Sequence, residues 1–394
     1  MRIESVDVFY LAMPQILDIG DGSQDMTLVR VRADDGSTGW GECEASPLPT
    51  IAAFVTAPSH SACHGVLDSV QGAAINGPAD IATLARRVLE RGLDLLQTAH
   101  AWSGVEIALW DLLGRATGEP AWALAGHSHC EPRRPYASQL FGDTPEQTHA
   151  RAVEVAKAGY RAAKFGWGPY GRGTVAEDAA QVQAARVGLG PDATLLVDAG
   201  TVWGEDVEAA AARLPALADA GVVWLEEPFA SGALAAYADL AGRTSRVALA
   251  GGEGASDQYQ ARQLIDHGRL GYVQIDTGRI GGIGPATAVA GYAEARDVRF
   301  VNHTFTSHLA LAASLVPYAG QPGELLCEYP VAASPLATGL VTNPLLPDAD
   351  GLVRLTERPG LGVELDLAAV APYLQQLEIV LNGTCRYRTP ELTP

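Results

Sequence analysis

The chain has 394 residues with a formal net charge of −19, and 47% of its residues are hydrophobic. This charge argues against nucleic acid and anionic membranes as partners, because both are bound through basic patches. The length and hydrophobic content exclude a disordered chain and are typical of two or three globular domains, or of one barrel with a smaller unit.

The cysteines are scattered and form no paired motif, which indicates a reducing compartment without structural disulfides. The first residues lack the charged and apolar regions of a signal peptide. No apolar run approaches the roughly 20 residues that cross a membrane. We therefore expect a cytoplasmic protein with no membrane partner.

The N-terminal part of the chain predicts an α+β unit of roughly 130 residues. Residues 1 to about 45 show alternation typical of antiparallel strands, and Asp34-Asp35-Gly36 is a hairpin turn signal. From about 77 to 118 the period becomes helical, and Gly118-Glu119-Pro120 ends the helix.

From about residue 135, short apolar runs alternate with alanine-rich helical stretches. Strands separated by helices of about 10–15 residues imply βαβ units, and eight units over about 200 residues indicate a (β/α)₈ barrel. The eight predicted strands are residues 136–140, 161–165, 195–198, 222–226, 247–250, 272–276, 300–303 and 325–328. We place the barrel at 131–345 and expect 346–394 to pack back on the N-terminal unit.

Seven of these eight apolar strands end in, or lead directly to, an ionisable residue. In a barrel all such ends converge at one mouth, where barrel enzymes carry their sites. A single charge at a strand end is commonly just leaving the core, but seven in register favour a shared site. The seven residues are Lys164, Asp198, Glu226, Glu253, Asp276, His303 and Glu328.

Three of the seven predict a metal site. Asp198, Glu226 and Glu253 come from consecutive strands, and three neighbouring carboxylates repel unless a cation lies among them. Oxygen ligands without paired cysteine or histidine favour Mg²⁺ over zinc. The alternative is a set of salt bridges, for which Lys164 is the only basic group among the seven besides the histidine.

Two further residues predict a general base. His303 and Asp276 end adjacent strands, and a carboxylate beside an imidazole fixes its tautomer and raises its pKa. A lone histidine is more often structural, but this one has a carboxylate partner and a predicted metal site across the barrel. For His308, in the loop that follows, both a role in the site and the start of the next helix stay open.

Several segments resemble the mandelate-racemase-like subgroup of the enolase superfamily, and the resemblance covers essentially the whole chain. Gly39-Trp40-Gly41-Glu42 and residues 104–111 look like its capping domain, and Trp224-Leu225-Glu226-Glu227-Pro228 like its second metal-ligand strand. Residues 274–283 look like its sixth-strand motif, and residues 359–363 like its C-terminal return.

The resemblance implies a modified, enolase-like (β/α)₈ barrel with an N-terminal α+β capping domain, residues 1–130, completed by the C-terminal segment. It implies Mg²⁺-assisted removal of the proton α to a carboxylate, with the enediolate stabilised by the metal. It also implies a homo-oligomer (dimer, tetramer or octamer). Matched residue by residue, Asp198, Glu226 and Glu253 are metal ligands, His303–Asp276 is the base dyad, and Glu328 hydrogen-bonds a substrate oxygen as an electrophile.

The sequence departs from this family at two places. Racemases of the family typically carry Lys-x-Lys on the second strand, whereas this chain has Lys164-Phe165-Gly166. Racemisation needs bases on both faces of the substrate, while β-elimination can use one base whose imidazolium returns the proton to the leaving hydroxyl. Lys164 then pairs with the substrate carboxylate, and a direct acid/base role stays open. Gly200 stands where many relatives have asparagine, which leaves substrate details open.

Two other interpretations of the sequence compete with this enzyme function. Gly166-x-Gly168-x-x-Gly171 fits a dinucleotide-binding fingerprint, but Pro169 interrupts the turn and Asp198 lies farther away than the usual ~20 residues. A non-catalytic, substrate-binding member of the family would lose a ligand or the base, and this chain keeps all of them.

We therefore expect a Mg²⁺-dependent acid-sugar dehydratase, a hydro-lyase that converts an aldonate or aldarate to a 2-keto-3-deoxy acid. A racemase or epimerase and a cycloisomerase, which share the enolisation step, are the alternatives. The capping-domain loops at residues 18–25 and 45–50 are expected to contribute to substrate choice.

Overall fold

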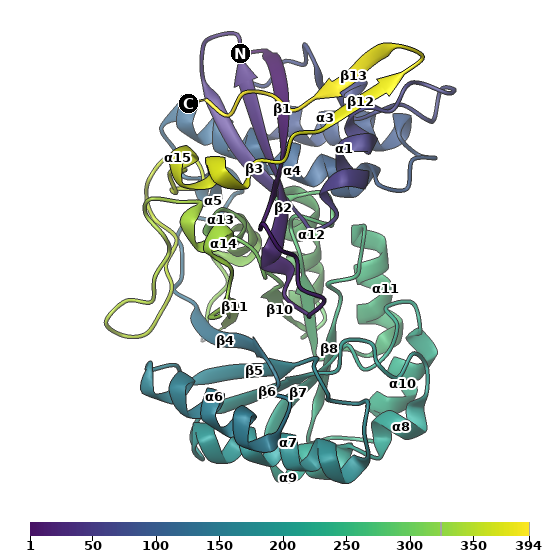
Figure 1. The fold of residues 1–394 in the computed structure, drawn as a ribbon, viewed down its shortest axis with the longest axis vertical. Coiled ribbons are helices and arrows are strands. Elements are labelled where there is room, and N and C mark those ends of the chain that lie inside the picture. Colours follow the sequence, from purple (N-terminus) through teal and green to yellow (C-terminus); the bar gives the residue numbers. More distant parts are fainter. Residues whose placement is uncertain (324, 394) are drawn as a thin grey trace.

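The eight predicted barrel strands form one parallel sheet in the order β10-β9-β8-β7-β6-β5-β4-β11 (Figure 1). The computed structural model describes residues 1–323 and 325–393 and confirms each of the eight. The strands are β4 (Arg134–Leu140), β5 (Ala162–Gly166), β6 (Thr194–Asp198), β7 (Val222–Glu226), β8 (Ala248–Gly251), β9 (Tyr272–Ile275), β10 (Arg299–Asn302) and β11 (Leu326–Pro330). Side chains on their inner faces fill the barrel, so it is a packed core.

Helices connect successive strands and cover the outside of the barrel, as βαβ units require (Figure 1). They are α6 (Pro145–Lys157), α7 (Val175–Leu189), α8 (Val207–Ala211), α9 (Leu214–Asp219), α10 (Leu234–Gly242), α11 (Gln258–Gly268), α12 (Ile283–Glu294) and α13 (His308–Leu315). The last strand is followed by the short α14 (Pro335–Gly339), a helix that the sequence analysis did not predict. None of the helices in the described residues is long and apolar enough to cross a membrane.

The two end strands of the sheet, β10 and β11, meet along a seam that a side chain bridges. No ladder joins these strands in the described part of the chain. Instead the Glu328 amide donates to Asn302 Oδ1 at 2.9 Å, and Asn302 Nδ2 donates to the Glu328 carbonyl at 3.5 Å. The Tyr318 hydroxyl, in η2 (Val316–Tyr318), also donates to Asn302 Oδ1 at 2.9 Å. One buried amide therefore joins the two edges.

Replacing Asn302 with alanine is expected to lower the free energy of unfolding by about 1–3 kcal/mol, because the buried Glu328 amide loses its acceptor and the Tyr318 hydroxyl keeps only the Leu326 carbonyl. Urea unfolding measures this change. Asn76→Ala, at an exposed site, is the matched control and should stay within about 0.5 kcal/mol of the wild type. An equal stability of Asn302→Ala and this control would contradict the role of the seam amide.

The N-terminal unit is an antiparallel sheet covered by helices, as predicted. The strands β1 (Ile3–Ala12), β2 (Asp25–Ala33) and β3 (Thr38–Glu44) lie in that order. The long helix α4 (Thr98–Thr117) packs directly on β3, because Gly39 and Gly41 leave no side chain between them. A Cβ built at Gly41 would lie 2.1 Å from the Gly104 carbonyl oxygen, so this close packing requires glycine. The other elements are η1 (Gly22–Gln24), α1 (Pro47–Val55), α2 (Leu67–Val70), α3 (Pro78–Arg91) and α5 (Ala121–Leu124).

The C-terminal segment contacts this unit through a hairpin that the sequence analysis did not predict. β12 (Glu378–Leu381) and β13 (Thr384–Arg388) follow α15 (Leu367–Val370) and η3 (Ala371–Tyr373), and the Tyr387 hydroxyl donates to the Val8 carbonyl at 2.7 Å. Asn382 and Gly383 turn the hairpin with φ values of 50° and 78°, which is the type I′ pattern. Both termini lie at this end of the molecule (Figure 1). The domain boundaries at about 130 and 345 stay a prediction.

Candidate active site

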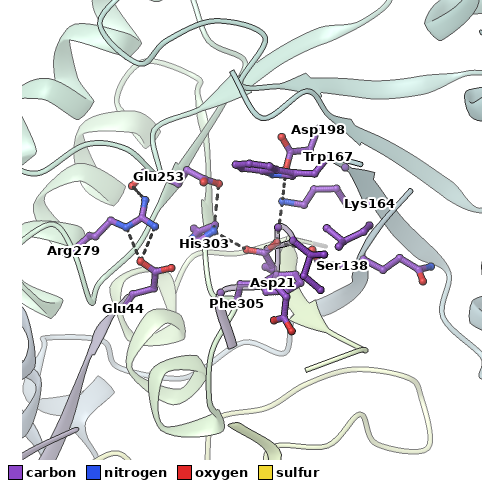
Figure 2. Close-up of a pocket in the computed structure, with 17 residues that line it drawn as sticks. Asp21, Glu44, Ser138, Lys164, Trp167, Asp198, Glu253, Arg279, His303 and Phe305 are labelled. Carbon is purple, nitrogen blue, oxygen red and sulfur yellow. Dashed lines mark hydrogen bonds and ion pairs between the residues drawn. The ribbon is translucent and has the colours of Figure 1, made fainter. Parts of the chain in front are cut away.

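A cavity of about 260 Å³ opens at the carboxyl ends of the barrel strands and is closed on one side by the N-terminal unit (Figure 2). Five of the seven predicted site residues line it, namely Lys164, Asp198, Glu253, His303 and Glu328. Glu226 and Asp276 are buried and contact residues of this set. The structure therefore brings all seven to one end of the barrel.

His303 and Asp276 form a close, buried pair. His303 Nδ1 lies 2.7 Å from Asp276 Oδ2, and the Gly278 amide donates to Asp276 Oδ1 at 2.6 Å. A proton on Nδ1 then leaves Nε2 as the acceptor, and Nε2 lies 3.3 Å from Glu253 Oε2. Burial opposes the charged imidazolium, but Glu253, Glu328 and Asp276 outweigh burial and raise the pKa of His303 well above its usual value.

Lys164 is the central cation of a buried ion-pair cluster. Its Nζ lies 2.5 Å from Glu226 Oε1, 2.9 Å from Glu328 Oε1 and 3.7 Å from Asp198 Oδ2. Glu226 Oε2 in turn accepts a hydrogen bond from Trp224 Nε1 at 3.0 Å. The salt-bridge alternative for the acidic residues is thus present in this conformation.

The predicted ligands Asp198, Glu226 and Glu253 are not arranged as a metal-binding set in this conformation. Within the part of the chain that the structure describes, no three histidine, cysteine or acidic side chains form such a group. Glu226 Oε1 instead lies beside the ammonium of Lys164. Negative charge is nevertheless in excess, and burial first, then neighbouring carboxylates, raise the pKa of Asp198 to about 6 and that of Glu226 to about 8. These oxygen donors fit a hard divalent cation.

Glu328 is fully buried and accepts from three sides. Lys164 pairs with Oε1, the Ser138 hydroxyl donates to Oε1 at 2.8 Å, and the Thr304 amide donates to Oε2 at 2.8 Å. Burial opposes the charge, but Lys164 and His303 hold the pKa of Glu328 below its usual value. An ionised carboxylate only accepts hydrogen bonds, so the electrophilic role of Glu328 needs a proton and stays a prediction.

The sequence analysis did not identify an ion pair between the two units of the fold. Arg279 Nε donates to Glu44 Oε2 at 2.7 Å, Arg279 Nη2 lies 2.6 Å from the same oxygen, and Nη1 donates to the Glu253 carbonyl at 3.0 Å. Figure 2 shows this pair on one side of the cavity, with Lys164 and Asp198 on the other. Arg279 lies in the sixth-strand motif, three residues after Asp276, and that proximity was the available signal.

Trp167 is a second lining residue that the sequence analysis did not identify. Its backbone is left-handed, with φ of 55°, and its indole lies against two glycines. A Cβ built at Gly200 would come within 2.8 Å of the ring, and one at Gly20 within 3.1 Å. The glycine in place of asparagine at position 200 therefore makes room for this indole.

His308 and the two capping loops complete the comparison with the predicted site. His308 is the first residue of α13, where its Nδ1 accepts from the Leu345 amide at 3.1 Å, and it does not line this cavity. Residues 19–22 of the first loop line the cavity, whereas residues 45–50 do not. The first loop thus lies where it can contact a substrate.

Comparison with known families agrees with this fold. Residues 147–369 match the family described as "Enolase C-terminal domain-like", and residues 11–126 match "Mandelate racemase / muconate lactonizing enzyme, N-terminal domain". The chain therefore belongs to the mandelate racemase/muconate lactonizing enzyme group of the enolase superfamily, and it is an enzyme of that superfamily.

Its relatives carry several activities. The chain is 31% identical to a D-galactarolactone cycloisomerase from Agrobacterium fabrum, covering 88% of this chain and 90% of that one. It is 30% identical to a D-galactonate dehydratase from Xanthomonas axonopodis pv. citri, with coverage of 86% and 88%.

Two solved structures share the fold. One, from Rhodobacter sphaeroides, is described as a predicted mandelate racemase; it has 57% identity and a TM-score of 0.95 and covers 99% of this chain and 100% of that one. A racemase from Streptomyces coelicolor A3(2), solved with bound magnesium, has 25% identity and a TM-score of 0.80, with coverage of 95% and 100%.

Proposed function

We propose that the protein is a Mg²⁺-dependent acid-sugar dehydratase that converts an aldonate or aldarate to a 2-keto-3-deoxy acid. The observation that carries this proposal is that a single base, His303 paired with Asp276, lines the cavity. The names of the relatives support an acid-sugar substrate, since they include galactonate and galactarolactone. A homo-oligomer and a cytoplasmic location stay predictions.

The metal would be held by Asp198, Glu226 and Glu253, and the relative solved with bound magnesium supports this choice of ion. When bound, Mg²⁺ supplies positive charge that stabilises the negative charge developing on the substrate carboxylate. Lys164 would then leave Glu226 and pair with the same carboxylate, because its ammonium lies beside two of these ligands, 2.5 Å from Glu226 and 3.7 Å from Asp198.

The protein residues carry the proton transfers. His303 Nε2 removes the proton α to the carboxylate, while Asp276 holds Nδ1 and stabilises the imidazolium. The imidazolium then gives its proton to the β-hydroxyl, the C–O bond breaks, and water leaves. The resulting enol tautomerises to the 2-keto product, so His303 returns to its starting state.

Racemisation or epimerisation has less support, because it needs a second base on the other face of the substrate. Gly166 occupies the position of that base, and a Cβ built there would lie 2.8 Å from the Asp198 Cβ. A cycloisomerase is the second candidate, favoured by the name of the relative from Agrobacterium. It needs the same first proton abstraction but eliminates a ring oxygen instead of water.

A screen of acid sugars and their lactones with Mg²⁺-loaded enzyme tests the proposal. We expect a 2-keto-3-deoxy acid from at least one open-chain acid, together with exchange of the α-proton in D₂O. Product from lactones alone would favour the cycloisomerase. No turnover and no exchange with any acid, despite bound Mg²⁺, would contradict the enzyme function proposed here.

The protonation of His303 is expected to depend on Mg²⁺. Without metal, Glu253 and the other carboxylates raise the pKa of His303, so its imidazole should titrate above about pH 6.5. Mg²⁺ offsets the charge of Glu253 and disfavours the imidazolium, so the midpoint should move to lower pH. Ring-proton NMR measures the titration, and the resonance absent from His303→Asn assigns it. An unchanged midpoint on adding Mg²⁺ would place the ion away from Glu253.

A further inference from the structure

The charges that line the cavity bear on whether the substrate carries one carboxylate or two. Three lining residues are basic, namely Lys164, Arg279 and His303. A second carboxylate on an aldarate would need a cation to replace its hydration, since a buried unpaired charge is costly. The question is therefore which of these three cations is available.

Two of the three belong to the reacting end of the cavity. Lys164 is bound by Glu226 and Glu328, and in the proposed function it pairs with the carboxylate next to the reacting carbon. His303 contacts Asp276 and faces Glu253, and it must be neutral to act as a base. Neither is available for a carboxylate at the far end of the substrate.

The third cation, Arg279, is neutralised from the capping unit. Its Nε and Nη2 lie 2.7 and 2.6 Å from Glu44 Oε2, and its Nη1 donates a hydrogen bond to the Glu253 carbonyl. Glu44 is buried, with a side-chain exposure of 6%, so water screens this pair little. Figure 2 shows the two side chains facing each other at the edge of the cavity.

The capping loop adds no cation of its own. Residues 19–22, which line the cavity, are Ile19, Gly20, Asp21 and Gly22, and the only charge among them is the carboxylate of Asp21. An acidic side chain here attracts hydroxyl donors and repels a carboxylate.

We infer that this site selects monocarboxylate acid sugars, the aldonates, over the dicarboxylate aldarates, and that Glu44 enforces the choice by occupying Arg279. This inference rests on the proposed function for the placement of the substrate. It narrows the substrate class to acids whose far end is a neutral, hydroxylated carbon.

Matched pairs of acids test the inference. The hexonate and hexarate of the gluco, galacto and manno configurations differ only in the terminal carbon. We expect each hexonate that binds to bind Mg²⁺-loaded His303→Asn about tenfold or more tightly than its hexarate, measured by calorimetry, because one uncompensated charge costs about that much. The wild type should show the same order in kcat/KM.

Glu44→Gln tests the stated cause. This change frees Arg279, so the preference for the hexonate should fall roughly tenfold, with the hexarate gaining affinity. Glu90→Gln removes the same charge from an exposed position on α3 and should leave the preference unchanged. An unchanged preference in Glu44→Gln would overturn the role of Glu44.

The binding and turnover results separate this inference from the proposed function. A hexarate that binds the Mg²⁺-loaded enzyme as tightly as its hexonate would overturn the inference alone. A hexonate preference in binding without any dehydration would support the inference and contradict the dehydratase. Failure of every hexonate to bind would overturn the inference, whereas only the wider screen of acid sugars decides the proposed function.

Discussion

Replacing His303 with asparagine is expected to lower kcat/KM for dehydration by about 10²–10⁴-fold, the usual contribution of a general base. Asparagine is similar in length and can still donate to Asp276, but its amide cannot accept the α-proton at neutral pH. Exchange of the substrate α-proton in D₂O should fall in parallel with product formation, because both begin with the same step.

Two controls make this prediction specific. His267→Asn changes an exposed histidine at the end of α11 and should keep wild-type kcat/KM. The circular dichroism spectrum of His303→Asn should match that of the wild type, which excludes unfolding as the cause. If His303→Asn kept its α-proton exchange, another group would be the base.

Replacing Lys164 with methionine is expected to lower the free energy of unfolding of the metal-free protein by about 3–5 kcal/mol, as when one partner of a buried ion pair is removed. Lys164 is 4% exposed, and without it Glu226 and Glu328 lose their nearest positive charge. Urea unfolding in the presence of a chelator measures this loss. Activity should also fall, since the proposed partner of the substrate carboxylate is gone.

Mg²⁺ should reverse much of this loss. The ion would supply the charge that Lys164 provided, and it would no longer compete with the ammonium for Glu226, so its affinity for Lys164→Met should exceed that for the wild type. Lys157→Met is the matched control, because Lys157 is exposed and pairs with the exposed Glu154; its effect should stay within about 1 kcal/mol. Weaker Mg²⁺ binding by Lys164→Met would contradict the expectation that Mg²⁺ and the Lys164 ammonium compete for Glu226.

The barrel and the ends of its strands were predictable because two simple patterns coincide in the sequence. Apolar runs set the strands, and the polar residue that ends a parallel strand necessarily lies at one mouth of the barrel. Asp198, His303 and Glu328 could therefore be placed together without any knowledge of the packing between distant elements. The hairpin turned by Asn382 and Gly383 carried an equally local signal that was overlooked.

The remaining features of the site depend on contacts between distant segments. The pairing of Arg279 with Glu44 spans 235 positions and exists only because the N-terminal unit packs on the barrel mouth. The insertion of Lys164 among the carboxylates depends on side-chain conformations that strand patterns leave free. Trp167 lines the cavity with a left-handed backbone. Bulky residues rarely adopt this conformation, so the sequence does not predict it.

The barrel sheet is open between β10 and β11, because no backbone ladder joins these two strands in the described part of the chain. His303 follows one edge of this opening and Glu328 lies on the other, with His303 Nε2 and Glu328 Oε2 4.0 Å apart. Across the seam, the Asn302 side chain and the Thr304 amide hold Glu328 in place of a backbone ladder. The distance between base and carboxylate therefore depends on side-chain contacts at the seam, whereas backbone ladders join the neighbouring strands in the rest of the sheet.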